Sequence, residues 1–114
     1  MLETVTDLLK KEFELVGAVP NGRLVLNIFE QLRPDLIVMD IAMPELDGIR
    51  TARELRLRGC EAKIVFLTVQ EDEDYISAAL NAGASGYVLK SRMQSDLIIA
   101  LKKVLAGEVF VSRR

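Results

Sequence analysis

Apolar residues along this chain alternate between helical spacing and strand-like runs. Two uninterrupted runs, at 36–39 and 64–67, have the character of strands buried on both faces, which is typical of parallel sheets. Residues 86–89 form a short third strand, and residues 13–19 form an apolar segment that stops at a Pro-Asn-Gly turn signal. We interpret this last segment as a further strand, which gives four predicted strands.

Between these runs, apolar residues recur three or four positions apart, which is the spacing of helices packed along one face. The pattern predicts five helices, over 2–9, 24–32 and 72–82, from Ile49 to a stop at Gly59, and from Ser91 to a stop at Gly107. Alternating helices and strands predict an α/β fold, a doubly wound parallel sheet with helices on both faces.

The sequence also predicts where some of these helices begin and end and which residues face the core. Ser91 and Gln94 resemble a capping box at the start of the last helix, and Gly83 is expected just after the helix at 72–82. In that helix the residues expected to face inward are Tyr75, Ala78, Ala79 and Ala82. The apolar residues that define the last helix are Leu97, Leu101, Val104 and Leu105.

Composition narrows the function classes. With 114 residues we expect one domain, 1–114, and a net charge of -2 argues against direct nucleic-acid binding. The lone Cys60 favours a reducing compartment, and no apolar run has membrane-spanning length, so we expect a cytoplasmic protein. Histidine is absent, which removes the commonest general base of ordinary enzymes.

Three predicted strands end on polar side chains that suit phosphate chemistry: Asp40, Thr68 and Lys90. The carboxyl ends of parallel strands share one edge of the sheet, so these side chains should converge there. A carboxylate can carry a phosphoryl group, an ammonium can neutralise it, and a hydroxyl can donate a hydrogen bond to it. A solvated strand end is the ordinary reading of each residue alone; the three together favour phosphoryl transfer.

Three segments resemble response regulator receiver domains of bacterial two-component systems. They are Asp40-Ile-Ala-Met-Pro-Glu-Leu-Asp-Gly48, Val65-Phe-Leu-Thr68 and Ala82-Gly-Ala-Ser-Gly-Tyr-Val-Leu-Lys90. The ending Ala-Gly-Glu-Val-Phe-Val-Ser112 is similar to receivers that precede a helix-turn-helix output domain. The resemblance implies a flavodoxin-like receiver fold, a sensor histidine kinase as partner and a DNA-binding output.

The resemblance also implies roles for single residues. Asp40 is the phosphoacceptor, Thr68 the switch hydroxyl and Lys90 the phosphate-pairing lysine. Tyr87 is the switch aromatic, for which plain core packing is the alternative interpretation. Mg²⁺ is expected on Asp40 and the backbone carbonyl of Ala42.

The family pattern also has a first strand and an acidic pair before the first helix, and neither matches a segment of this sequence. The expectation is an N-terminally incomplete receiver with weak or absent Mg²⁺ binding and poor phosphorylation. Without the first strand, the strand at 36–40 would have an open edge, which a rearranged sheet or a domain-swapped homodimer would cover. Val69 is bulkier than the small residue frequent beside the switch threonine, and it is expected to narrow access to Asp40.

Two other functions remain open from the sequence. One is a phosphorylation-independent interaction module that keeps the receiver surface without metal chemistry. The other is a small flavin or nucleotide binder, which the sheet type permits but which a missing glycine-rich phosphate loop makes the weaker interpretation.

Overall fold

A computed structural model describes Leu26 and residues 35–41 and 47–112 of the chain. The described strands form one parallel sheet in the order β1-β2-β3-β4. These strands are β1 (Leu36–Asp40), β2 (Lys63–Thr68), β3 (Gly86–Leu89) and β4 (Phe110–Val111). The described helices are α3 (Gly48–Leu57), α4 (Glu73–Asn81), the 3-10 helix η1 (Lys90–Arg92) and α5 (Met93–Leu105).

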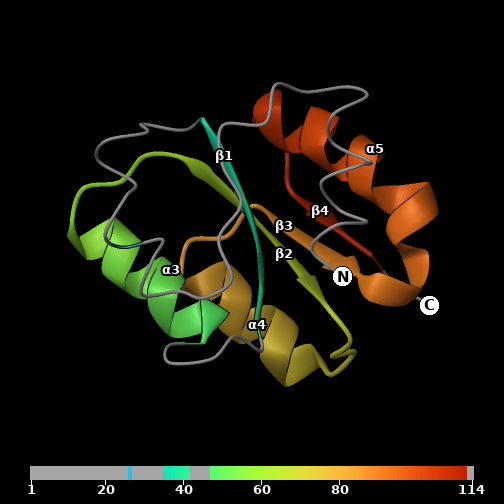
Figure 1. The fold of residues 1–114 in the computed structure, drawn as a ribbon, viewed down its shortest axis with the longest axis horizontal. Helices are drawn as coiled ribbons and strands as arrows, with labels where there is room; N and C mark the ends of the chain where they lie inside the picture. The colour runs from blue at the N-terminus through green and yellow to red at the C-terminus, as the bar shows by residue number, and fades with distance from the viewer. Residues whose placement is uncertain (1–25, 27–34, 42–46, 113–114) are drawn as a thin grey trace.

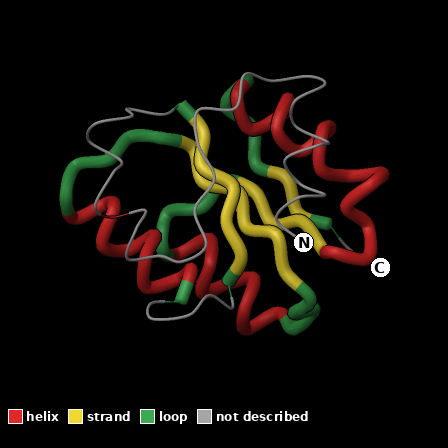
Figure 2. Tube along the Cα trace, viewed as in Figure 1, coloured by secondary structure: helices red, strands yellow, loops and turns green. Residues whose placement is uncertain are grey.

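Helices lie on both faces of this sheet. Figure 1 shows α3 and α4 together on one side of the strands and α5 on the other, and Figure 2 shows the strands as the central layer. Alternate residues of each strand therefore face different helices, which explains why β2 is apolar at almost every position. Ile64 and Phe66 belong to the cluster under α3 and α4, whereas Val65 and Leu67 belong to the cluster under α5.

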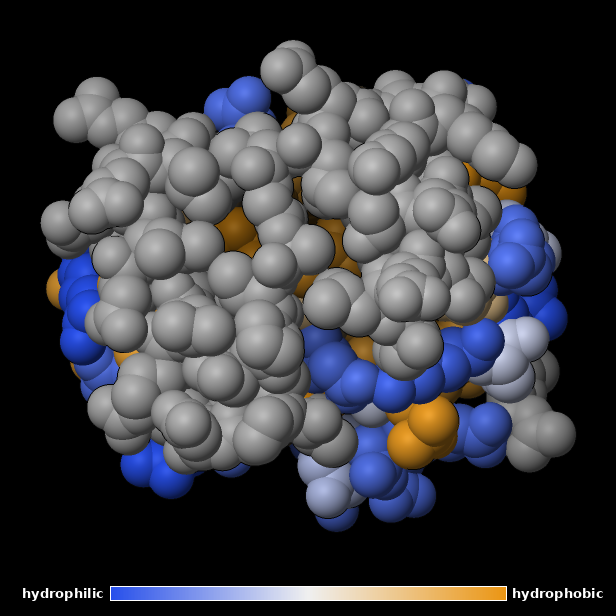
Figure 3. Space-filling view, in the orientation of Figure 1, coloured by the Kyte–Doolittle hydropathy of each residue, from blue (hydrophilic) through white to orange (hydrophobic). Residues whose placement is uncertain are grey.

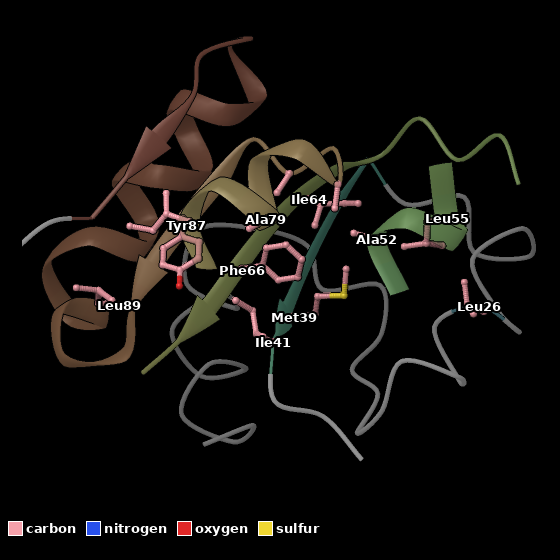
Figure 4. Packing of buried hydrophobic residues seen from close by; sticks show 13 residues of the cluster. Leu26, Met39, Ile41, Ala52, Leu55, Ile64, Phe66, Ala79, Tyr87 and Leu89 are labelled. Carbon is pink, nitrogen blue, oxygen red and sulfur yellow. The ribbon is translucent and has the colours of Figure 1, made fainter. Parts of the chain in front are cut away.

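The larger cluster is built around two aromatic rings. Phe66 and Tyr87 are register partners on β2 and β3, and both are fully buried. Figure 4 shows their rings close together on the side of the sheet that also carries Met39 and Ala79. These strands are therefore held from both faces, which fixes the position of their carboxyl ends.

The predicted α/β receiver fold is confirmed as far as the described residues reach. The strands expected around 36–40, 64–67 and 86–89 are present and parallel. The strand at 13–19, the helix at 2–9 and, apart from the buried Leu26, the helix at 24–32 lie outside the described residues. The missing first strand, the total helix count and the rearranged or swapped sheet therefore stay predictions.

One strand was not predicted. β4 pairs with β3, with Phe110 opposite Gly86 and Val111 opposite Tyr87. A strand of two residues is too short to produce a recognisable alternation, so only its apolar character was visible in the sequence.

Two local predictions were wrong. The capping box at Ser91 does not form, because Ser91 lies within η1 and α5 begins at Met93 without a side-chain cap. Tyr75 is exposed, and the neighbouring Ile76 fills the inward position of α4 instead. Among the apolar residues of α5, Leu97, Leu101 and Val104 are buried, whereas Leu105 in the last turn is exposed. By contrast, Gly83 does follow α4 with the positive φ expected there.

The described helices are all too short or too polar to span a membrane.

Candidate functional site

Asp40 and Lys90 form an ion pair at the carboxyl edge of the sheet. Asp40 is the last residue of β1, and Lys90 follows the last residue of β3. Their side chains are 23% and 26% exposed, respectively. The pair is therefore reachable from solvent, and the predicted convergence of these two side chains is present in the structure.

The topology explains why a lysine is suited to this position. β2 lies between β1 and β3, so the two strand ends are separated by two strand spacings, roughly 10 Å. A lysine has a long flexible stem that can cross this gap and place a point charge on the carboxylate. A short side chain after β3 could not reach Asp40.

Thr68 ends β2, between the two partners of the ion pair. The residue is almost completely buried, and its hydroxyl accepts a hydrogen bond of 3.1 Å from the backbone N–H of Gln70. A hydroxyl can accept and donate at once, so this bond leaves its proton for another oxygen. The same bond fixes the first turn of the chain after β2.

Tyr87 contacts the same loop from the neighbouring strand. Its hydroxyl donates to the carbonyl oxygen of Gln70 at 2.8 Å, and its ring is fully buried. Burial raises the pKa of this hydroxyl to about 12, although interaction with Thr68 opposes the shift. The hydroxyl therefore stays protonated at neutral pH and remains a donor.

Gln70 is the residue at this site that the sequence did not reveal. Its backbone N–H bonds Thr68 and its carbonyl bonds Tyr87, so the two predicted switch residues are connected through one residue of main chain. Such contacts do not depend on side-chain identity, so no motif could have indicated them. The only available signal was its place two residues after Thr68.

The backbone around Asp40 is closely packed against the start of α3. The N–H of Gly48 donates to the carbonyl of Ile41 at 2.7 Å. A Cβ added at Gly48 would lie 2.4 Å from the carbonyl oxygen of Asp40 and 2.8 Å from the ring of Phe66. Only glycine permits this approach, which holds the end of β1 at Asp40 against the helix. Met43 and Pro44 lie outside the described residues.

Val69 follows Thr68 and is 65% exposed. Figure 3 shows apolar surface surrounded by hydrophilic side chains where β2 ends and α4 begins. The hydrophilic residues of this stretch include the acidic residues Glu71, Asp72, Glu73 and Asp74. The predicted effect of Val69 on access to Asp40 stays a prediction.

The donor set for Mg²⁺ is incomplete among the described residues. No group of three or more His, Cys, Asp or Glu side chains that could hold a metal occurs within Leu26, 35–41 and 47–112. Asp40 has the right chemistry, but a Mg²⁺ site adds further oxygen ligands. Ala42, whose carbonyl was the other expected ligand, lies outside the described residues.

Comparison with known proteins identifies the family. Residues 1–102 match the response regulator receiver domain. The chain is 36% identical to the transcriptional regulatory protein DegU of Brevibacillus brevis over 103 residues, which are 90% of this chain and 44% of DegU. It is 37% identical to the nitrate/nitrite response regulator NarL of Escherichia coli K12 over 101 residues, 89% of this chain and 47% of NarL.

The fold comparison agrees. A LuxR-family two-component response regulator from Aurantimonas sp. SI85-9A1 superposes with a TM-score of 0.90 at 28% identity, covering 95% of this chain and 79% of that one. The chain spans about half the length of the curated relatives it matches. The sequence match over residues 1–102 and the shared fold lead to one conclusion: the chain belongs to the response regulator receiver domain family.

Proposed function

We propose that this receiver accepts a phosphoryl group on Asp40 and thereby switches an output. The observation that carries the proposal is the Asp40–Lys90 ion pair at the solvent-reachable edge of the sheet. Receiver domains act with histidine kinases and are phosphoacceptors rather than conventional enzymes. A sensor histidine kinase is accordingly the proposed partner.

The chemistry needs few groups. A carboxylate oxygen of Asp40 forms a bond to phosphorus, while the bond from phosphorus to the donor's nitrogen or oxygen breaks and the donor leaves with the electron pair. Lys90 already lies against this carboxylate, so it can neutralise the added negative charge. Thr68 is proposed to donate its hydroxyl proton to a phosphoryl oxygen while it keeps the bond from Gln70.

The output is proposed to bind DNA. DegU is named a transcriptional regulatory protein, and the matched stretch is less than half of its length. This chain has a net charge of -2, which does not favour phosphate-backbone binding by the receiver itself. A separate segment would therefore make the DNA contacts.

Receiver domains normally bind Mg²⁺, and we propose that binding is weak in this chain. Asp40 is the carboxylate that the described residues bring to the site, and Lys90 competes with a cation for it. Phosphorylation should then need Mg²⁺ at concentrations well above those of a site with several carboxylates.

Intact-protein mass after incubation with acetyl phosphate tests the proposal over a series of Mg²⁺ concentrations. We expect one added phosphoryl group, complete loss of the addition in Asp40→Asn, and normal addition in Asp35→Asn. Asp35 precedes β1 and lies at its opposite end, so it is a matched control for charge removal beside the same strand.

Equal labelling of Asp40→Asn and the unchanged chain would contradict the assignment of Asp40. No addition at any Mg²⁺ concentration would favour the alternative, a phosphorylation-independent interaction module. The incomplete set of acidic ligands among the described residues is the observation that keeps this alternative in view.

A further inference from the structure

The last described strand has little to hold it in place by itself. β4 contains two residues. Its flanking backbone hydrogen bonds run from Phe110 N–H to the carbonyl of Ser85 at 3.0 Å and from Ser112 N–H to the carbonyl of Tyr87 at 2.8 Å. Strands usually have five or six residues, and a short strand at the end of a sheet gains little from its ladder. Some further contact should fix it.

Asp96 supplies that contact from the first turn of α5. One oxygen of its carboxylate accepts a hydrogen bond of 2.7 Å from the hydroxyl of Ser112, the residue directly after β4. Both residues are buried, at 7% and 2% exposed. Hydrogen bonds to an ionised acceptor are roughly twice as strong as neutral ones, so this bond can stabilise a strand of two residues.

The carboxylate is held in position by donors from η1 and from the first turn of α5. Arg92 donates to it from Nε at 2.9 Å, and Ser95 donates from its hydroxyl at 3.0 Å. Burial alone would raise the pKa of Asp96, but the hydrogen bonds from Arg92, Ser112 and Ser95 together with the charge of Arg92 lower it. The group is therefore ionised at neutral pH, with one oxygen directed at Ser112.

The strand that β4 joins is the one that carries Tyr87. The carbonyl of Tyr87 accepts from Ser112, while its hydroxyl donates to Gln70. Three residues further along the chain, Lys90 binds Asp40. A displacement of β3 at Tyr87 would therefore act on the loop after Thr68 and on the C-terminal strand together.

We propose that Asp96 is a positioning residue whose hydrogen bond to Ser112 latches β4 onto β3 and so holds Ser112 at a fixed point beside Tyr87. The hydrogen bond between Asp96 and Ser112 does not require phosphorylation to form. A role of the latch in signalling rests on the proposed function, because the latch would transmit the phosphorylation of Asp40 through β3 to β4.

Amide hydrogen exchange followed by NMR tests the latch without any phosphodonor. In Asp96→Asn and in Ser112→Ala we expect protection of the amides at positions 110–112 to fall about tenfold or more, while the amides of β2 keep theirs. Ser95→Ala is the matched control, since it removes a hydroxyl donor from the same carboxylate without touching β4. It should change β4 protection less than about twofold.

Two results would overturn the latch. Protection at positions 110–112 could remain unchanged in Ser112→Ala, which would mean that the bond does not hold β4. Alternatively, Ser95→Ala could open β4 as much as Ser112→Ala, which would mean that Asp96 acts only by maintaining α5.

The signalling role is tested by repeating the exchange measurement with acetyl phosphate and Mg²⁺, with intact mass recorded on the same samples. We expect phosphorylation to change β4 exchange about fivefold or more, and Ser112→Ala to abolish that change. Phosphorylated protein with unchanged β4 exchange would overturn the signalling role and leave the proposed function intact. Absence of the phosphoryl group would overturn the proposed function and with it the signalling role. The latch is decided separately, by the exchange measurement without a phosphodonor.

Discussion

Two aspartates of this domain, Asp40 and Asp96, have their carboxylates in contrasting surroundings. Asp40 lies at the open edge of the sheet, where its side chain is 23% exposed and pairs with Lys90. Asp96 is enclosed between α5 and β4, where its side chain is 11% exposed and accepts from Arg92, Ser95 and Ser112. The two side chains have the same chemistry in isolation, and their neighbours give them different exposure and different hydrogen-bond donors.

The donors differ in kind as well as in access. Lys90 is a single flexible ammonium that can follow the negative charge when a phosphoryl group is added. Arg92 presents a planar fork from one helical turn away, and Ser112 is fixed by its own backbone bond to Tyr87. A carboxylate held in this second way has little freedom to meet an incoming phosphorus atom, so we expect phosphoryl transfer at Asp40 alone.

Gly48→Ala should have the largest effect on stability, because it disturbs the backbone around Asp40. The added methyl group would collide with the carbonyl of Asp40 and the ring of Phe66, and one of those neighbours must move. We expect the free energy of unfolding to fall by about 3 kcal/mol, measured by urea denaturation.

Gly59→Ala is the control for this experiment. Gly59 has a φ of 83° but open space around its Cβ position, so alanine there meets conformational strain without a collision. Its cost should be about 1 kcal/mol. If Gly48→Ala costs no more than Gly59→Ala, the close packing at Asp40 is not what the geometry indicates.

The cluster of polar residues around Asp40 was largely predictable from the sequence, for a physical reason. Strands buried on both faces leave continuous apolar runs, and the polar residue that ends such a run marks the sheet edge. Asp40, Thr68 and Lys90 could therefore be placed at one edge before the structure was known. That Lys90 contacts Asp40 follows from topology, because β1 and β3 flank the same strand.

The contact between Asp96 and the C-terminal strand could not be predicted in the same way. A two-residue strand leaves no periodic signal, and the contact between Asp96 and Ser112 exists only because β4 returns to the sheet. The capping interpretation of Ser91 failed for a related reason, since the chain continues from β3 into η1 before α5 begins. Local sequence patterns describe local structure, whereas both of these features depend on the packing of distant segments.

Removing the charge of each aspartate in turn should lower the free energy of unfolding by different amounts. Asp96→Asn replaces a buried carboxylate with a neutral amide, whose oxygen can still accept from Ser112 but whose NH₂ group then faces the donors Arg92 and Ser95. We expect a loss of about 2 kcal/mol. Asp40→Asn breaks an ion pair that is partly solvated, and we expect a change below about 1 kcal/mol. Both are measured by urea denaturation at pH 7; equal losses would show that Asp40 is as structural as Asp96.

The smallest expected effect is a change of the Asp96 contribution with pH. The folded-state pKa of Asp96 is lowered from 3.8, because the hydrogen bonds from Arg92, Ser112 and Ser95 outweigh the opposing effect of burial. A carboxyl group with a lowered pKa stabilises the folded state above its unfolded pKa and loses that contribution as the pH falls through the folded pKa.

The difference in unfolding free energy between the unchanged chain and Asp96→Asn should therefore be constant from pH 7 to about 5. It should then narrow as the pH falls from about 5 toward 3.5. Urea denaturation over this pH series measures the gap, and because other carboxyl groups titrate in both proteins, the difference isolates Asp96. A gap that widens on acidification would mean that Asp96 is held in its neutral form, and the hydrogen bonds from Arg92 and Ser112 would then need reassignment.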